Sequence, residues 1–447
     1  MRGARVSGLA VMFVAAMTAG PPPVCAQAPE DVTVALSLAD ATARSIEASH
    51  RLGELVARRE GNDAFVQSVR AGGLPQLAVL GGYTRTNHVE EFGIPQPNGT
   101  VRILYPDVPD NWRSRLDLLW PLYTGGRIQA LTQAARSEAL ASAHDVDAAR
   151  TDLRLEVARA YWGLVTAREG VKVVEGALRR VEAYLVDARA RLDAGFVAPN
   201  DVFAAEAQRS LQQALLIEAR NFAGLANLSL ARLVGLPAGT TIEPIDPLDV
   251  TPANELEPGP LVEEARRSRN DRVALEARIA AAAARIDAAG SGLKPALYVG
   301  AGADMARPNP KIFPRAEEWQ GSWDVGVSAA WSIFDGGRTR ADMATAAAAE
   351  RALRERLQDY DTQLDVEIRQ RLLELGSSRA RATASAEAVR SAAEARRVLE
   401  DRYRAGVATS TEVLDAQVVL LDAELSRTRA AAALRLAEAG LERALGR

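Results

Sequence analysis

Two stretches of the chain alternate between apolar and polar residues, and each passes into a very long helical pattern. In residues 112–123 the apolar positions are Leu116, Leu118, Trp120 and Leu122, and the charged positions between them are Arg113, Arg115 and Asp117. Residues 323–334 repeat the plan, with Trp323, Val325, Val327, Ala329, Trp331 and Ile333 against Asp324, Ser328 and Ser332. Because successive side chains of a strand point to opposite faces, this period of two predicts two β-strands.

Two further stretches, 76–86 and 297–305, alternate in the same way and predict partner strands. An apolar face backed by a charged face fits the wall of a membrane barrel, with lipid outside and water inside. A half-buried strand of a soluble sheet has the same period, so the pattern alone leaves both interpretations open. The segments 87–111 and 306–322 contain several prolines and many polar residues, and they predict loops.

Pairs of glycines mark the change from strand to helix, at Gly125, Gly126, Gly336 and Gly337. Glycine adopts backbone angles that side chains forbid, so the chain is able to turn sharply there. No proline interrupts 127–193 or 338–404, and a helix of that length is roughly 100 Å long. Such a helix belongs in a coiled coil or a helical tube rather than in a small globule.

Shorter helical patterns complete the chain, at 36–71, 200–234, 261–289 and 409–445. Gly195 and Gly406 interrupt the long patterns and predict hairpin turns. Asn200 and Asp201 are the expected caps of the helix that begins at residue 200.

The second half of the chain repeats the first at a constant offset. Equivalent residues lie 211 positions apart without a gap, among them Trp112 and Trp323, and Gly195 and Gly406. The sequence therefore predicts two tandem copies of one structural unit, at 27–235 and 261–447. The segment between them, 236–260, is rich in proline, threonine and acidic residues and is the expected linker.

Composition favours long helices, because charged residues make up 25% of the chain and aromatic residues only 5%. A formal net charge of -4 gives no sign of a nucleic-acid partner. The histidines are scattered, and no HExxH spacing, phosphate-binding loop or GxSxG elbow occurs. The sequence therefore predicts no enzyme, no metal site and no cofactor.

The N-terminus has the pattern of an export signal over residues 1–26. Arg2 and Arg5 precede an apolar stretch that is too short to span a bilayer, and a small-residue cleavage site ends at Ala26. Cleavage there would remove Cys25, the only cysteine of the chain. The alternative is a lipoprotein acylated at Cys25, for which the preceding Val24 is unusually bulky.

Four strands are too few to close a membrane barrel, since single barrels need about eight or more and open edges are not tolerated in lipid. If these strands lie in a membrane, several chains must share one barrel.

The duplicated plan of helix, β-hairpin and long helical hairpin resembles the TolC-type outer-membrane factors of bacterial efflux and type I secretion. The resemblance rests on the strand ends WPLYTGGR and WSIFDGGR, on the helix segment EVARAYWGL, and on the hairpins RLDAGFVAPNDV and RYRAGVATSTEVLDAQ. It covers nearly the whole mature chain, and the order and duplication of these segments are its specific feature.

This resemblance implies a mainly α fold with a β-barrel part. Three copies would form a twelve-stranded barrel in the outer membrane, standing on a long periplasmic helical tunnel. It also implies a passive export duct with two partners, a periplasmic adaptor (a membrane fusion protein) and an inner-membrane transporter of the RND or ABC class. A periplasmic coiled-coil adaptor or tether is the alternative function, although it would have no use for lipid-facing strands.

In that family the turns at Gly195 and Gly406 lie at the periplasmic tip, which is the closed end of the tunnel. Glu412 and Asp415 map onto two acidic positions that ring the entrance of TolC. Three copies would bring these carboxylates together, favour cations, and raise some of their pKa values by repulsion. Glu412 also completes a capping box with Thr409, and the two roles are compatible.

Tyr403 matches a tyrosine that helps to hold the TolC entrance shut, and Asp201 matches its acidic counterpart. The arginine of that latch is replaced by Ala408, so the latch is either absent or rebuilt here. The alternative roles are packing for Tyr403 and helix capping for Asp201.

Overall fold

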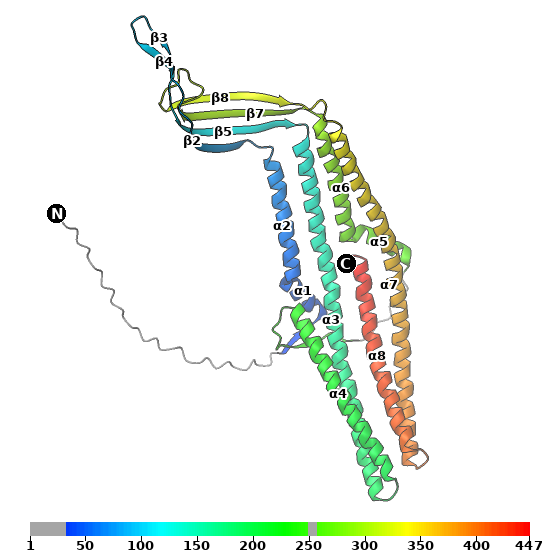
Figure 1. The fold of residues 1–447 in the computed structure, drawn as a ribbon. Helices are drawn as coiled ribbons and strands as arrows, with labels where there is room; N and C mark the ends of the chain where they lie inside the picture. Colours follow the sequence, from blue (N-terminus) through cyan, green and yellow to red (C-terminus); the bar gives the residue numbers. More distant parts are fainter. Residues whose placement is uncertain (1–32, 249–256) are drawn as a thin grey trace, which may run out of the picture.

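The computed structural model describes residues 33–248 and 257–447. A small sheet lies at one end of an elongated helical body, two helical hairpins form the other end, and the C-terminus lies about halfway along (Figure 1). The predicted signal peptide, including Cys25, and residues 249–256 of the predicted linker lie outside the described residues. Within the described ranges, no helix is both long enough and apolar enough to cross a bilayer.

Four helices make the two hairpins. The long ones are α3 (Arg127–Asp193) and α7 (Arg338–Arg404), each of 67 residues, and the returning ones are α4 (Pro199–Leu233) and α8 (Ser410–Ala444), each of 35. Helix α7 begins and ends 211 residues after α3, at 338 against 127 and at 404 against 193. The hairpin turns contain Gly195 and Gly406, whose φ angles of 74° and 75° favour glycine.

Two of the predicted helices, 36–71 and 261–289, are each broken once, where the sequence predicted continuous helices. Residues 36–71 form α1 (Leu38–Ala48) and α2 (His50–Ala71), because Ser49 is extended and accepts a hydrogen bond from Leu52 N. The second segment forms α5 (Pro258–Ser268) and α6 (Asn270–Gly290), separated by the extended Arg269. A short 3-10 turn, η1 (Ser291–Leu293), then leads into the sheet. Helices α2 and α6 both pack on α3, which places the sheet above a helical platform.

The four-stranded sheet consists of β2 (Gln76–Arg85), β5 (Asp110–Thr124), β7 (Ala296–Arg307) and β8 (Gln320–Ala330). Its order is β2-β5-β7-β8, and every neighbouring pair is antiparallel. The predicted strand to residue 334 was too long. Ala330 pairs with Ala296, where β7 begins, so the backbone beyond Ala330 meets no strand of the described chain.

Two pairs of short strands were not predicted. Inside the expected loop 87–111, β3 (Phe92–Pro95) and β4 (Val101–Tyr105) form a hairpin that projects beyond the sheet (Figure 1). Halfway along the helices, β1 (Thr33–Leu36) pairs in parallel with β6 (Thr241–Pro244), which lies in the expected linker.

The β1–β6 pair lies against the largest apolar cluster of the described chain, which includes Tyr161 and Leu164 of α3. The Tyr161 hydroxyl donates to Leu36 O and accepts from Asp246 N, both at 3.1 Å. Burial raises the pKa of Tyr161 to about 12, so the hydroxyl keeps its proton at physiological pH and donates. This tyrosine therefore ties the strand pair to α3.

Candidate functional site

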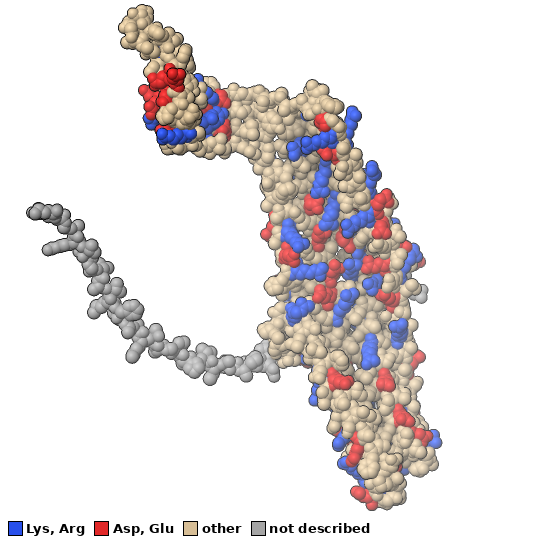
Figure 2. Space-filling model, in the orientation of Figure 1, with Lys and Arg blue, Asp and Glu red and all other residues tan. Residues whose placement is uncertain are grey.

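One face of the sheet is apolar and exposed. Its side chains share a face through the register of the strands and include Leu77, Val79, Trp112, Leu116, Trp120, Trp323, Val325 and Val327. Val79 is 72% exposed, Trp323 77% and Val327 71%. In Figure 2 the middle of the sheet shows no charged residue, and a cluster of charged residues lies at the end of the sheet far from the helices. A contiguous exposed apolar surface of this kind needs an apolar partner.

The opposite face carries a network of ion pairs. Asp304, whose side chain is 2% exposed, binds Arg113 Nε at 2.7 Å and Arg115 Nη1 at 2.5 Å. Arg115 also reaches Asp324 (Nη1 to Oδ1, 3.0 Å) and Asp117 (Nε to Oδ1, 2.5 Å). Gly302 makes this possible, because a Cβ there would lie 2.1 Å from Arg115 Nη2. The register therefore separates an apolar face from a charged one.

The strand-to-helix turns have the predicted glycine geometry. Gly125 and Gly126 have φ angles of 65° and 89°, and Gly336 and Gly337 have 68° and 86°. Gly126 and Gly337 are the N-terminal caps of α3 and α7. In the second turn Asp335 accepts hydrogen bonds from Gly337 N at 3.0 Å and Thr339 N at 2.8 Å, which fixes the start of α7.

At the other end of the molecule, a buried aromatic cluster joins the two hairpins. The rings of Tyr184 (α3) and Tyr403 (α7) lie 5.5 Å apart, and the Tyr184 hydroxyl donates to Ser410 Oγ of α8 at 2.7 Å. Arg191 lies over the Tyr403 ring at 4.9 Å and donates to Tyr403 O at 3.4 Å. Sequence reasoning missed Tyr184, Arg191 and Ser410, because only their place in space relates them to Tyr403.

The predicted entrance residues fall into different environments. Tyr403 is buried in the aromatic cluster, whereas Glu412 and Asp415 are exposed on one side of α8. Glu412 completes the predicted capping box: its carboxylate accepts from Thr409 N at 2.7 Å, and its own N–H donates to Thr409 Oγ1 at 3.3 Å. The Thr409 hydrogen bonds lower the pKa of Glu412, so within one subunit this group is charged at neutral pH.

Asp201 lies in the first turn of α4, and its expected capping role was wrong. The cap is Ala198, whose side chain makes no capping hydrogen bond, and Pro199 begins the helix. Proline suits this position because its fixed φ matches the first helical residue, so the helix begins earlier than the polar residues suggested.

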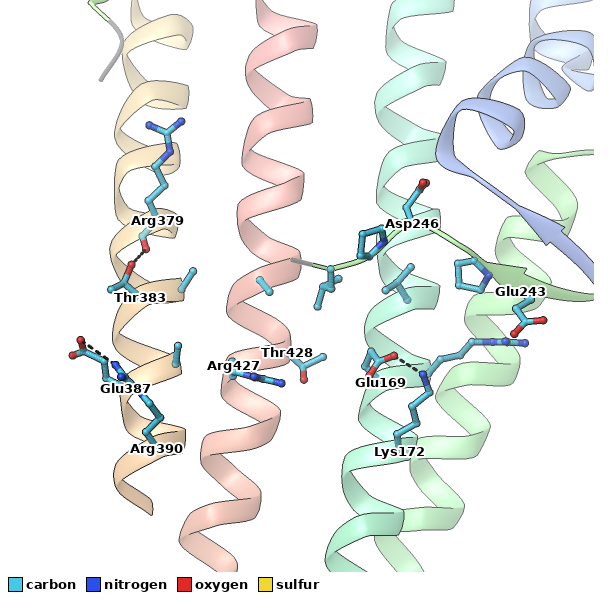
Figure 3. A pocket seen from close by; sticks show the side chains of 18 residues that line it. Glu169, Lys172, Glu243, Asp246, Arg379, Thr383, Glu387, Arg390, Arg427 and Thr428 are labelled. Atoms are coloured by element: carbon cyan, nitrogen blue, oxygen red, sulfur yellow. Dashed lines mark hydrogen bonds and ion pairs between the residues drawn. The ribbon is translucent and has the colours of Figure 1, made fainter. Parts of the chain in front are cut away.

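A cavity of about 880 Å³ lies halfway along the helices, between α3, α7 and α8 and the segment after β6 (Figure 3). Its wall mixes charges of both signs, including the pairs Lys172–Glu169 at 2.6 Å and Arg390–Glu387 at 3.6 Å. Across residues 33–248 and 257–447, no group of three or more His, Cys, Asp or Glu side chains is placed to hold a metal ion.

A match to the model of a known protein family identifies the family of this chain. The model described as "Outer membrane efflux protein" matches residues 42–236 and 261–447. The chain belongs to the outer membrane efflux protein family. That membership makes it an outer-membrane efflux channel of a tripartite pump, and it does not favour the alternative of a periplasmic adaptor.

Solved outer-membrane channels share the fold. OprN aligns with a TM-score of 0.77 and 22% identity over 92% of this chain and 89% of its own. VceC of Vibrio cholerae aligns with a TM-score of 0.76 and 22% identity, over 92% of this chain and 96% of its own. The open state of MtrE of Neisseria gonorrhoeae aligns with a TM-score of 0.74 and 21% identity, over 92% of this chain and 88% of its own. The search of curated proteins found no match. At this identity the likeness establishes the fold of the chain.

Proposed function

We propose that three copies of this chain form one twelve-stranded barrel in the outer membrane, continued by a helical tunnel that serves as a passive export duct. The observation that carries the proposal is the four-stranded sheet, with an exposed apolar face, a charged face and two edge strands. Unpaired strand edges are not tolerated in lipid, so β2 of one copy must pair with β8 of the next. The apolar face then meets lipid and the charged face lines the lumen.

The duct has the same plan in each half of the chain. We propose two tandem repeats, 27–235 and 261–447, behind a signal peptide at 1–26, with 236–260 joining them. The support is that both hairpins have equal helix lengths and a common offset. Equal hairpins would pack side by side around a common axis in a tunnel wall.

The hairpin tips are the proposed periplasmic entrance. They carry exposed apolar residues, Phe196 at 82% and Val407 at 63%, next to Gly195 and Gly406. We propose that these tips meet a periplasmic adaptor, which links the duct to an inner-membrane transporter. Glu412 and Asp415, both exposed on α8, would form a ring of carboxylates in the assembled mouth and favour cations.

Outer-membrane fractions test the proposal. The full chain, run on gels without heating, should migrate as a trimer and shift to a monomer after boiling. Recovery only as a soluble periplasmic monomer would rule out the duct. The experiment separates the two functions, because a periplasmic adaptor or tether would be recovered as the soluble monomer.

A further inference from the structure

The segment 308–319, between β7 and β8, folds back over the charged face of the sheet. Lys311 Nζ is 2.9 Å from Asp304 Oδ2 and also pairs with Asp324. Both carboxylates stand on the charged face, because Asp304 lies opposite Arg115 in the register and Asp324 belongs to the same alternate set. The loop therefore reaches across the charged face of the sheet instead of standing free above it.

The start of this loop has a defined turn. Asn309 is fully buried, and its Nδ2 donates to Gln320 O at 2.8 Å and to Ser322 Oγ at 3.0 Å. Its Oδ1 accepts from Lys311 N at 2.9 Å. These bonds direct Lys311 toward the two aspartates.

Arg315 fixes the middle of the loop to the β3–β4 excursion. Its guanidinium lies 4.9 Å from the centre of the Tyr105 ring, and Nη1 donates to the Tyr105 hydroxyl at 2.6 Å. Nη2 donates to Asn111 Oδ1 at 3.2 Å, and the backbone N donates to Leu104 O at 3.3 Å. These contacts join the loop 308–319 and the β3–β4 hairpin into one structure at this end of the sheet.

A cavity of about 320 Å³ lies between loop and sheet. Its wall side includes Gly82 and Thr84 of β2 and Arg113 of β5, and its loop side includes Pro308, Pro310 and Arg315. Figure 2 shows the charged cluster of this region at the end of the sheet far from the helices. The loop therefore covers part of the charged face.

We propose that the loop 308–319 is an extracellular constriction of the duct, held over the inner wall by Lys311 and Arg315. The inference rests on the proposed function, which makes the charged face the lumen. Each copy in the assembly would place the same loop at the same rim. The ion-pair network of the wall has two arginines and three aspartates, and Lys311 adds a third cation to it. The charges that cargo passes at the rim are therefore paired with one another.

Cysteine accessibility from outside the cell tests this arrangement. Ala306→Cys places a thiol on the wall beneath the loop, at a position that is 1% exposed, and Gln96→Cys places one in the exposed turn between β3 and β4. Intact cells are treated with a bulky, membrane-impermeant maleimide, and the parent chain controls for Cys25. We expect Gln96→Cys to react quickly and Ala306→Cys slowly.

The same two thiols are then compared in the Lys311→Gln/Arg315→Gln background, with Lys172→Gln as a control for loss of an exposed lysine. Labelling follows the population of the open loop, so loss of both anchors should speed the Ala306→Cys reaction about tenfold and leave Gln96→Cys unchanged. Equal rates for Ala306→Cys in both backgrounds, or rapid labelling with the loop intact, would overturn the constriction. Failure of Gln96→Cys to label at all would instead overturn the outer-membrane placement, and this inference with it.

Discussion

Tyr184 of α3 donates a hydrogen bond to Ser410 of α8, with 2.7 Å between the two oxygens. Both residues are buried, and burial raises the pKa of Tyr184, which keeps its proton for donation. This bond connects the first hairpin to the second close to their tips, where the entrance is proposed. It therefore contributes to keeping the hairpins together.

Removing this bond should loosen the entrance. Tyr184→Phe leaves a buried Ser410 hydroxyl without its partner and costs about 1 kcal/mol. In planar bilayers we expect more frequent or larger openings than in the parent channel. Tyr298→Phe is the matched control, because it removes a tyrosine hydroxyl on β7, in the sheet at the opposite end of the molecule. Equal behaviour of the two variants would show that the Tyr184–Ser410 bond does not restrain the tips.

The proposed ring of carboxylates is testable without disturbing the helix. Glu412→Gln keeps the capping box, because glutamine also serves at that position, and Asp415→Asn keeps the size of its side chain. We expect the double variant to lose cation preference, measured as reversal potential in a salt gradient, and to resist block by trivalent cations. Selectivity that matches the parent channel would exclude these residues from the entrance.

The two faces of β8 should differ in their tolerance of charge. Val327 lies on the apolar face and Ser328 on the charged face. Val327→Arg should cost about 2–4 kcal/mol per subunit if it faces the middle of the bilayer, whereas Ser328→Arg should be close to neutral. The readout is the fraction of chains recovered as heat-modifiable trimers. Similar losses for both substitutions would argue against a lipid-facing sheet.

The junction between α5 and α6 should make the fold sensitive to acid. Arg269 is 5% exposed and binds Asp271 (Nη2 to Oδ2, 2.7 Å) and Glu367 of α7 (3.1 Å). Burial raises the pKa of Asp271, but the hydrogen bond and charge of Arg269 outweigh it, so the net pKa lies below the ordinary value of 3.8. A carboxylate with a depressed pKa in the folded state stabilises above its ordinary pKa and loses that contribution as the pH falls through the depressed value.

We therefore expect the melting temperature to fall below about pH 4, and Asp271→Asn to show a smaller fall from a lower starting point. Thermal unfolding at a series of pH values measures both. A variant with the same acid dependence as the parent would place the sensitivity elsewhere.

The long helices were predictable to the residue because their ends have local signals. Gly126 and Gly337 precede them with positive φ, and no proline interrupts them. The β3–β4 hairpin was missed although Asn98 and Gly99 form a recognisable turn, because the flanking prolines suggested a loop. The β1–β6 pair joins residues about two hundred positions apart through four-residue strands, too short for a periodic signal.

The candidate sites also divide into those that have local sequence signals and those that are formed by residues from different elements. The capping box at Thr409 and Glu412 depends on adjacent residues, and the prediction was confirmed. Asp201 was misplaced because polarity favoured a cap where the fixed geometry of Pro199 began the helix. Asp304 of β7 and the loop residues Lys311 and Arg315 act through partners on other elements, although the alternation of Asp304 with apolar neighbours could have placed it on the charged face.

The subunit count of the folded protein in detergent tests the central claim most directly. Native mass measurement of the full mature chain, with circular dichroism on the same sample, should give three chains per particle and a clear sheet signal. A stably folded single chain with little sheet signal would contradict the shared barrel, because it would show that the chain folds without neighbouring copies and without the sheet.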